Sequence, residues 1–78
     1  MSTDSEIPKW SHIEIGKHVS KLRKANKMTK YKLAICSGIS QSVLMRVETG
    51  EREPRINTLM RIIEGLDMTP GEFFKPFH

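Results

Sequence analysis

The sequence predicts an all-α fold, and two kinds of signal support this prediction. Apolar residues recur three or four positions apart, which places them on one face of a helix. Serine or threonine stands where several helices should begin, and glycine stands where two of them should end. These signals divide the chain into five helical segments within one small domain of 78 residues.

The first helix is expected over residues 12 to 26. Ser11 and Glu14 form the S-x-x-E pattern of a capping box, and Trp10 precedes it, where it could pack against Ile15 as a hydrophobic staple. An apolar stripe with steps of four and three residues is expected to face the core: Ile15, Val19 and Leu22.

Two shorter helices are expected around a glycine turn. Thr29 suits the N-cap of a helix over 30–37, and Ser40 suits the N-cap of a helix over 41–49. Gly38 and Gly50 fall where the backbone should become left-handed. The small Ala34 indicates that the two helices cross closely, at roughly 90–120°.

The last two helices follow a loop that contains Pro54. The fourth is expected to begin at residue 57 or 58 and to end at 66. Thr69 and Glu72 repeat the capping pattern with Pro70 at the first helical position, and Pro76 should end this short fifth helix. The inward residues of the fourth helix are expected to be Leu59, Ile62, Ile63 and Leu66.

The outward face of the segment 41–49 is polar. If Leu44 and Val47 are buried, Ser42, Met45, Arg46 and Thr49 point the other way, and Gln41 projects from the helix start. Arginine pairs with guanine, glutamine pairs with adenine, and an apolar group contacts the thymine methyl. Periodicity alone would favour a merely solvated face, so the interpretation depends on the wider motif.

That wider motif resembles a known family, the phage-repressor and Cro-like helix-turn-helix proteins. The matching residues are LRKANKMTKYKLAICSGISQSVLMRVETGEREP and then NTLMRIIEGLDMTPGEFF, and the resemblance spans roughly Ile15 to Phe74. It implies a compact five-helix bundle in which the segment 41–49 is the recognition helix in the DNA major groove. Small stand-alone members of this kind include phage repressors and restriction-modification controller proteins.

The resemblance also implies roles for individual residues. Base-edge contacts would come from Gln41, Ser42 and Arg46. Val43 and Met45 would contact the bases through their apolar side chains. Phosphate contacts would come from Lys30, Ser40, Thr49, Arg52 and Arg55. The family often pairs an arginine late in the first helix with the glutamate that closes the recognition helix, here Arg23 and Glu48. This pair is interpreted as structural, although it could also be an exposed pair worth about 0–1 kcal/mol.

Four positions depart from the family pattern. Lys30 replaces a glutamine that commonly opens the motif, which favours phosphate over base contact. Ser37 stands at a position that is more often apolar, and Asp67 stands where a glycine often ends the fourth helix. Gly65 lies inside that helix, at a cost of roughly 0.5–1 kcal/mol relative to alanine.

The charge is unevenly distributed. The net charge is +4 and the isoelectric point about 9.5, but residues 9–32 hold eight cations against the single anion Glu14, a net charge of +7. A localised basic surface favours association with polyanions through counterion release. The outer lysines of the first helix are equally well explained as residues that only solvate its surface. Lys27, Lys30 and Lys32 lie nearer the motif and are the better candidates for contact with a polyanion. The eight cations are Lys9, Lys17, Lys21, Arg23, Lys24, Lys27, Lys30 and Lys32.

The two ends of the chain carry separate expectations. Residues 1–9 are expected to form a flexible N-terminal segment, and residues 10–78 the DNA-binding domain with its C-terminal aromatic tail. Phe73 is expected in the core, whereas Phe74 and Phe77 are predicted to form a homodimer interface. The alternative is that both rings fold back over the first and fourth helices.

Catalysis and metal binding are not expected. His12 and His18 are six residues apart, His78 is terminal, and Cys36 is interpreted as a small buried hydrophobe. No apolar run reaches the roughly 20 residues of a membrane span, and no signal-peptide core is present. The sequence therefore predicts a protein that needs no cofactor, has no small-molecule ligand, and acts in the cytoplasm on the nucleoid.

The expected function is a sequence-specific, DNA-binding transcriptional regulator that acts as a dimer on an operator with two half-sites. The alternative is a protein-interaction module of the same fold, such as an antitoxin or antirepressor. The polar face of the segment 41–49 favours DNA, since only the FFKPF tail offers a dedicated protein interface.

Overall fold

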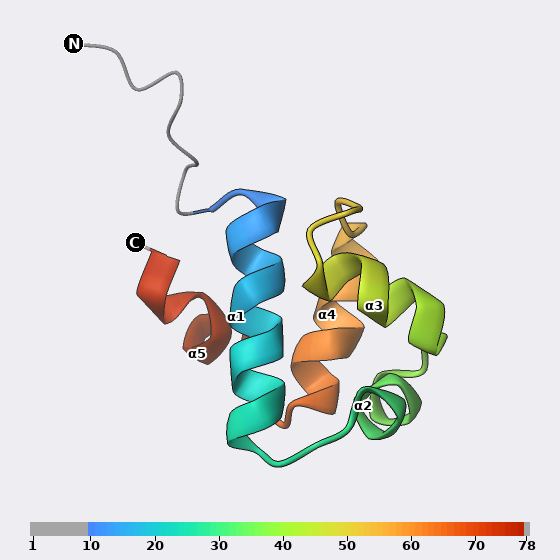
Figure 1. Ribbon diagram of the computed structural model, residues 1–78. Helices are drawn as coiled ribbons and strands as arrows, with labels where there is room; N and C mark the ends of the chain where they lie inside the picture. Colours follow the sequence, from blue (N-terminus) through green and yellow to red (C-terminus); the bar gives the residue numbers. More distant parts are fainter. Residues whose placement is uncertain (1–9, 78) are drawn as a thin grey trace, which may run out of the picture.

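Residues 10–77 are described by the computed structural model, and over this range the chain is entirely helical apart from its connections (Figure 1). The fold class is therefore all-α, as predicted. The expected flexible segment 1–9 and His78 lie outside the described residues. The elements are α1 (His12–Ala25), α2 (Lys30–Ser37), α3 (Gln41–Glu48), α4 (Ile56–Gly65), α5 (Pro70–Phe74) and a 3₁₀ turn, η1 (Lys75–Phe77).

Four of the five described α-helices begin at the capping residue that the sequence indicates. The side chains of Ser11, Thr29, Ser40 and Thr69 each accept a bond from the amide three residues later, at 3.0–3.3 Å. This satisfies an amide that has no partner within its helix.

Among the helices of the described range, only α5 has the complete capping box. There the carboxylate of Glu72 also accepts a bond from the amide of Thr69 at 2.9 Å. At the start of α1 the carboxylate of Glu14 instead faces Lys17 at 3.4 Å. Trp10, the expected staple partner of Ile15, is 70% exposed.

The helix ends combine expected and unexpected features. Gly38 and Gly50 are left-handed, with φ values of 70° and 75°, as the sequence predicts. Lys27 and Asp67 adopt the same conformation after α1 and α4, with φ values of 58° and 61°, although neither is glycine. A β-carbon makes this conformation unfavourable, so both positions store some strain.

Four predicted boundaries are wrong by one or two residues. The helices α1 and α3 each end one residue before the expected position, at Ala25 and Glu48. The larger difference is at α4, which begins at Ile56 and ends at Gly65. Ile56 is 64% exposed and therefore lies outside the apolar pattern, and its cap Arg55 makes no side-chain capping bond, so neither usual signal marks this start.

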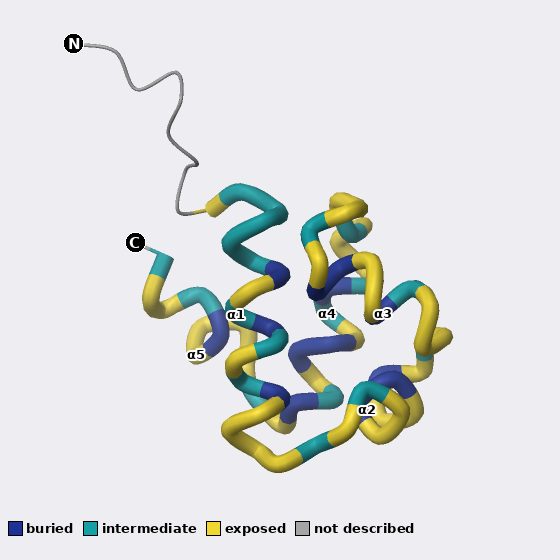
Figure 2. The backbone as a smooth tube through the Cα atoms, viewed as in Figure 1, coloured by how far each residue is buried: buried dark blue, intermediate teal, exposed yellow. Residues whose placement is uncertain are grey.

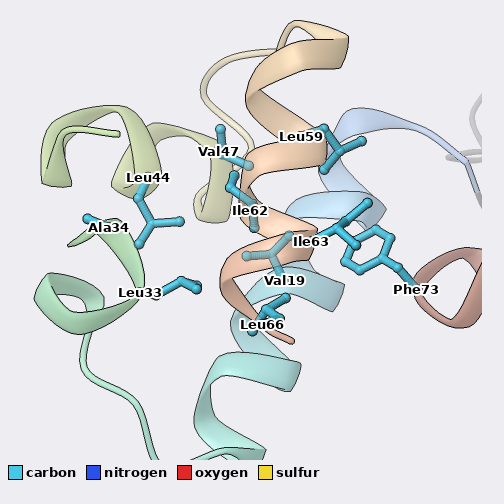
Figure 3. Packing of buried hydrophobic residues seen from close by; sticks show 10 residues of the cluster. All are labelled: Val19, Leu33, Ala34, Leu44, Val47, Leu59, Ile62, Ile63, Leu66 and Phe73. Atoms are coloured by element: carbon cyan, nitrogen blue, oxygen red, sulfur yellow. The ribbon is translucent and has the colours of Figure 1, made fainter. Parts of the chain in front are cut away.

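The core lies where the buried sides of the helices meet (Figures 2 and 3). In Figure 1, α2 and α3 lie on one side of α1, and α5 covers the opposite side. Phe73 enters the core from α5, beside Ile63 and Val19 (Figure 3). The buried apolar residues are Val19, Leu33, Ala34, Leu44, Val47, Leu59, Ile62, Ile63, Leu66 and Phe73.

The helices α2 and α4 approach closely at Ser37 and Gly65. A β-carbon built on Gly65 would lie 2.3 Å from the Ser37 hydroxyl oxygen and 3.2 Å from a methyl carbon of Leu33. The glycine inside α4 and the small polar residue in α2 are therefore explained together, since both make room for this crossing. The buried hydroxyl of Ser37 has no hydrogen-bond partner among residues 10–77.

The expectation that Cys36 is buried is wrong. Its side chain is exposed, because the inward positions of α2 are taken by Leu33, Ala34 and Ser37. Ser37 follows Ala34 by three residues and so continues the buried face, which turns the preceding Cys36 toward solvent.

Candidate nucleic-acid interface

The inward face of α3 holds this helix against the rest of the molecule. Leu44 is fully buried and Val47 is 1% exposed, and both join the core. Behind them α1 comes unusually close, because a β-carbon on Gly16 would lie only 2.1 Å from the carbonyl oxygen of Val47. The sequence gives no signal for this approach at Gly16, since a glycine within a helix does not indicate which neighbour lies against it.

Arg23 and Glu48 form a buried, bidentate ion pair. The Nε of Arg23 donates to one carboxylate oxygen of Glu48 at 2.7 Å, and Nη2 donates to the other at 3.1 Å. Both side chains are almost completely buried. Arg23 also donates through Nη1 to the carbonyl oxygen of Met28, at 2.9 Å, so one guanidinium joins α1, α3 and the segment that leads into α2.

The outward face of α3 is free to contact a partner. Gln41, Ser42 and Arg46 are exposed, and Met45 leaves 45% of its surface accessible. Val43 is half-buried, so it could contribute only an edge of its side chain. This face therefore presents an amide, a hydroxyl, a guanidinium and an apolar group, all of which can read base edges in a major groove.

The starts of α2 and α3 favour anions. Neither first turn contains an acidic residue, and the free amides of a helix start carry partial positive charge. Lys30, half-buried, adds a positive charge at the start of α2. The hydroxyl of Ser40 accepts its capping bond from Val43 and can still donate its own hydrogen to a phosphate.

The loop after α3 carries two exposed arginines, Arg52 and Arg55. Together with Val43 they line a hollow of about 370 Å³ beside the recognition helix. Thr49 is exposed as well, but its hydroxyl donates to the carbonyl oxygen of Arg46 at 3.3 Å. That hydroxyl would have to release this bond before it could donate to a phosphate.

The basic stretch is less positive at its surface than the sequence suggests. Arg23 is one of its eight cations, but it is buried against Glu48. Lys17 pairs with Glu14 across one turn of α1. Lys21, Lys24, Lys27 and Lys32 remain exposed.

The aromatic tail packs largely on its own chain. The rings of Phe74 and Phe77 lie 5.0 Å and 6.4 Å from that of Phe73, and both side chains are half-buried. The ring of His18 in α1 is tilted against that of Phe73 and edge-on to that of Phe77, and its Nε2 donates to the carbonyl oxygen of Phe73 at 3.0 Å. The tail is thus fixed to α1 while part of each outer ring stays accessible.

Residues 10–77 contain neither a metal-binding cluster nor a membrane-spanning helix. Within this range, no three His, Cys, Asp or Glu side chains gather closely enough to hold a metal ion. No helix in the same range combines the length and the apolar character needed to cross a membrane.

An exposed polar helix, fixed from behind and preceded by a capped helix and a glycine turn, defines a helix-turn-helix DNA-binding domain. Comparison with protein families agrees, because the Cro/C1-type HTH DNA-binding domain matches residues 18–77. The chain belongs to this family, and it is a DNA-binding transcriptional regulator. Comparison with curated protein sequences found no significant match.

Solved structures with the same fold include two restriction-modification controller proteins. The protein C.AhdI from Aeromonas hydrophila superposes with a TM-score of 0.76 and 28% identity, over 81% of this chain and 96% of that one. The wild-type protein C.Esp1396I superposes with a TM-score of 0.82 and 24% identity, over 87% of this chain and 88% of that one.

Proposed function

We propose that the protein binds a specific operator as a homodimer, with one recognition helix in the major groove of each half-site. The observation that supports this most directly is the division of α3 into two faces. Leu44, Val47 and Glu48 hold the helix in place, while its other side is exposed and chemically suited to bases. In a dimer the two copies of α3 would lie about 34 Å apart, one turn of the DNA helix.

Base recognition is proposed for Gln41, Ser42 and Arg46, with Met45 and the edge of Val43 contacting apolar groups such as the thymine methyl. Within residues 10–77 the guanidinium of Arg46 makes no hydrogen bond or ion pair, so it can pair with both acceptors of one guanine. The proposed phosphate contacts carry no base information and orient the domain. They are Lys30, Ser40, Thr49, Arg52 and Arg55.

The proposed dimer contact uses the accessible parts of Phe74 and Phe77. Because His18 and Phe73 hold the tail in place, these rings could pair with a second copy without first being ordered. Preorganisation lowers the entropic cost of association.

The oligomeric state can be measured by sedimentation equilibrium at tens of micromolar. We expect a dimer for the unchanged protein and a shift toward monomer for Phe74→Ala. Tyr31→Ala is the matched control, since Tyr31 is an aromatic residue on α2 that is 63% exposed. A monomeric unchanged protein, or equal effects of the two substitutions, would contradict this interface.

The biological role proposed is that of a transcriptional regulator such as the controller of a restriction-modification system, acting in the cytoplasm on the nucleoid. The similarity to C.AhdI supports this, because that protein is a controller of the same fold and its length is almost fully matched. Occupation of the operator would repress by excluding polymerase or activate by contacting it.

The DNA interaction is best tested by selecting bound duplexes from a random pool. We expect a recovered sequence with two symmetric half-sites, on which Arg46→Ala costs about 1–3 kcal/mol at one base pair of each half-site. Arg55→Ala should instead weaken binding to all sequences alike. It should also reduce the slope of log affinity against log salt concentration by about one unit for each half-site. A pool that yields no preferred sequence would refute specific recognition.

A further inference from the structure

Arg61 of α4 contacts the turn that joins α2 to α3. Its Nη1 donates to the carbonyl oxygen of Gly38 at 3.3 Å. Gly38 is the left-handed residue that ends α2, and the recognition helix begins three residues later at Gln41. Arg61 is exposed and lies on a different helix, so its bond crosses between elements that are far apart in the sequence.

The positive charge of Arg61 stabilises the C-terminal end of α2. The final carbonyl groups of a helix carry partial negative charge and lack partners within the helix. The last turn of α2 contains no basic residue. The guanidinium of Arg61 supplies this charge from α4, and bonds from an ionised donor are stronger than neutral ones.

The same face of α4 holds the end of α2 at a second point. Arg61 and Gly65 are four residues apart and therefore share a helix face. Gly65 lies directly against Ser37, while Arg61 reaches the next residue, Gly38. The last residue of α2 and the first residue of the turn are thus both held against α4.

We propose that Arg61 is a positioning residue for the recognition helix. It holds the turn at Gly38 and so sets where the base-reading start of α3 lies, without contacting DNA itself. This proposal rests on the proposed function, because it assigns Arg61 to base discrimination by α3. A phosphate-binding residue would raise affinity for all DNA, whereas a positioning residue raises the preference for the correct sequence.

The first test compares Arg61→Ala with Arg55→Ala in binding to the selected duplex and to a scrambled duplex over a range of salt concentrations. For Arg61→Ala we expect the ratio of the two affinities to fall about fivefold, the factor given by one hydrogen bond of ordinary net strength. The salt dependence should stay unchanged. Arg61→Lys keeps a charged donor and should recover part of the ratio.

The second test needs no DNA. The amide of Leu44 donates to the carbonyl oxygen of Ser40 in the first turn of α3. In Arg61→Ala its hydrogen exchange should be about fivefold faster, while exchange in the first turn of α1 stays unchanged. Arg61→Lys should again recover part of the effect.

Three results would overturn the proposal. Suppose that Arg61→Ala lowers the slope of log affinity against log salt concentration by about one unit for each half-site, and leaves the ratio of affinities for the selected and scrambled duplexes unchanged. Arg61 would then be a phosphate contact. A lower melting temperature with an unchanged ratio and unchanged exchange would make its role merely structural. If the affinity ratio, the salt dependence, the hydrogen exchange and the melting temperature are all unchanged, Arg61 has no role in positioning α3. If Arg46→Ala also has no effect, the proposed docking itself fails, and the exchange experiment still decides the role of Arg61.

Discussion

Replacing Gly16 by alanine should destabilise the domain by pushing α1 away from the recognition helix. The new β-carbon would lie 2.1 Å from the carbonyl oxygen of Val47 and 3.3 Å from that of Glu48. Ordinary carbon-to-oxygen contacts are about 3.3–3.6 Å, so the helices must separate by about 1.2–1.5 Å. Because the obstacle is backbone rather than the end of a flexible side chain, rotation of a side chain cannot relieve it.

The magnitude follows from two opposing effects. Overpacking a core costs about 1–3 kcal/mol, and the rigid obstacle places this case near 3. Alanine is the better helix former by up to about 1 kcal/mol. The net loss is therefore about 2 kcal/mol, from a total that is roughly 4–12 kcal/mol for a domain of this size. The corresponding drop in melting temperature is about 8–16 °C.

Gly71→Ala is the matched control. A β-carbon on Gly71 would meet nothing closer than the Thr69 hydroxyl oxygen at 4.0 Å, so only the gain in helix preference remains. Thermal and urea unfolding of both variants, followed by circular dichroism, measures the difference. The reasoning is refuted if Gly16→Ala melts at or above the temperature of the unchanged protein.

The remaining predictions use the same unfolding measurements. Ser37→Ala removes a buried hydroxyl without a partner and should raise the free energy of unfolding by about 1 kcal/mol, so a loss would show that the hydroxyl is satisfied. Asp67→Gly relieves a left-handed residue, which costs about 1–2 kcal/mol, but adds about 0.5–1 kcal/mol of backbone entropy cost. The net gain should be about 0.5–1 kcal/mol, and no gain would mean that the aspartate compensates locally. Glu48→Ala leaves Arg23 buried without its counterion and should cost about 3 kcal/mol. Glu14→Ala breaks an exposed pair and serves as its control, and equal losses would argue against a special role for the buried pair.

Local signals in the sequence were sufficient to place most of the helices. A capping hydroxyl such as Thr29 and a left-handed glycine such as Gly38 act within a few residues, so their effects can be predicted without the fold. The start of α4 at Ile56 was missed because it carries no capping side chain and an exposed apolar residue.

Features that join distant segments were harder to predict. The close approaches at Gly16 and Gly65 depend on where another helix crosses, which no local pattern records. Arg61 is an ordinary surface residue in the sequence and becomes distinctive only beside Gly38. The exposure of Cys36 was misjudged because its neighbour Ser37, although polar, occupies the buried position.

The two faces of α3 have a consequence for engineering. Leu44, Val47 and Glu48 are buried and hold the helix in place, while Gln41 and Arg46 are exposed. Substitutions of exposed residues away from caps usually change stability by less than about 0.5 kcal/mol. New operator preferences could therefore be introduced on this scaffold by exchanging only its outward residues, with a nearly constant melting temperature as the check that the frame has been left intact.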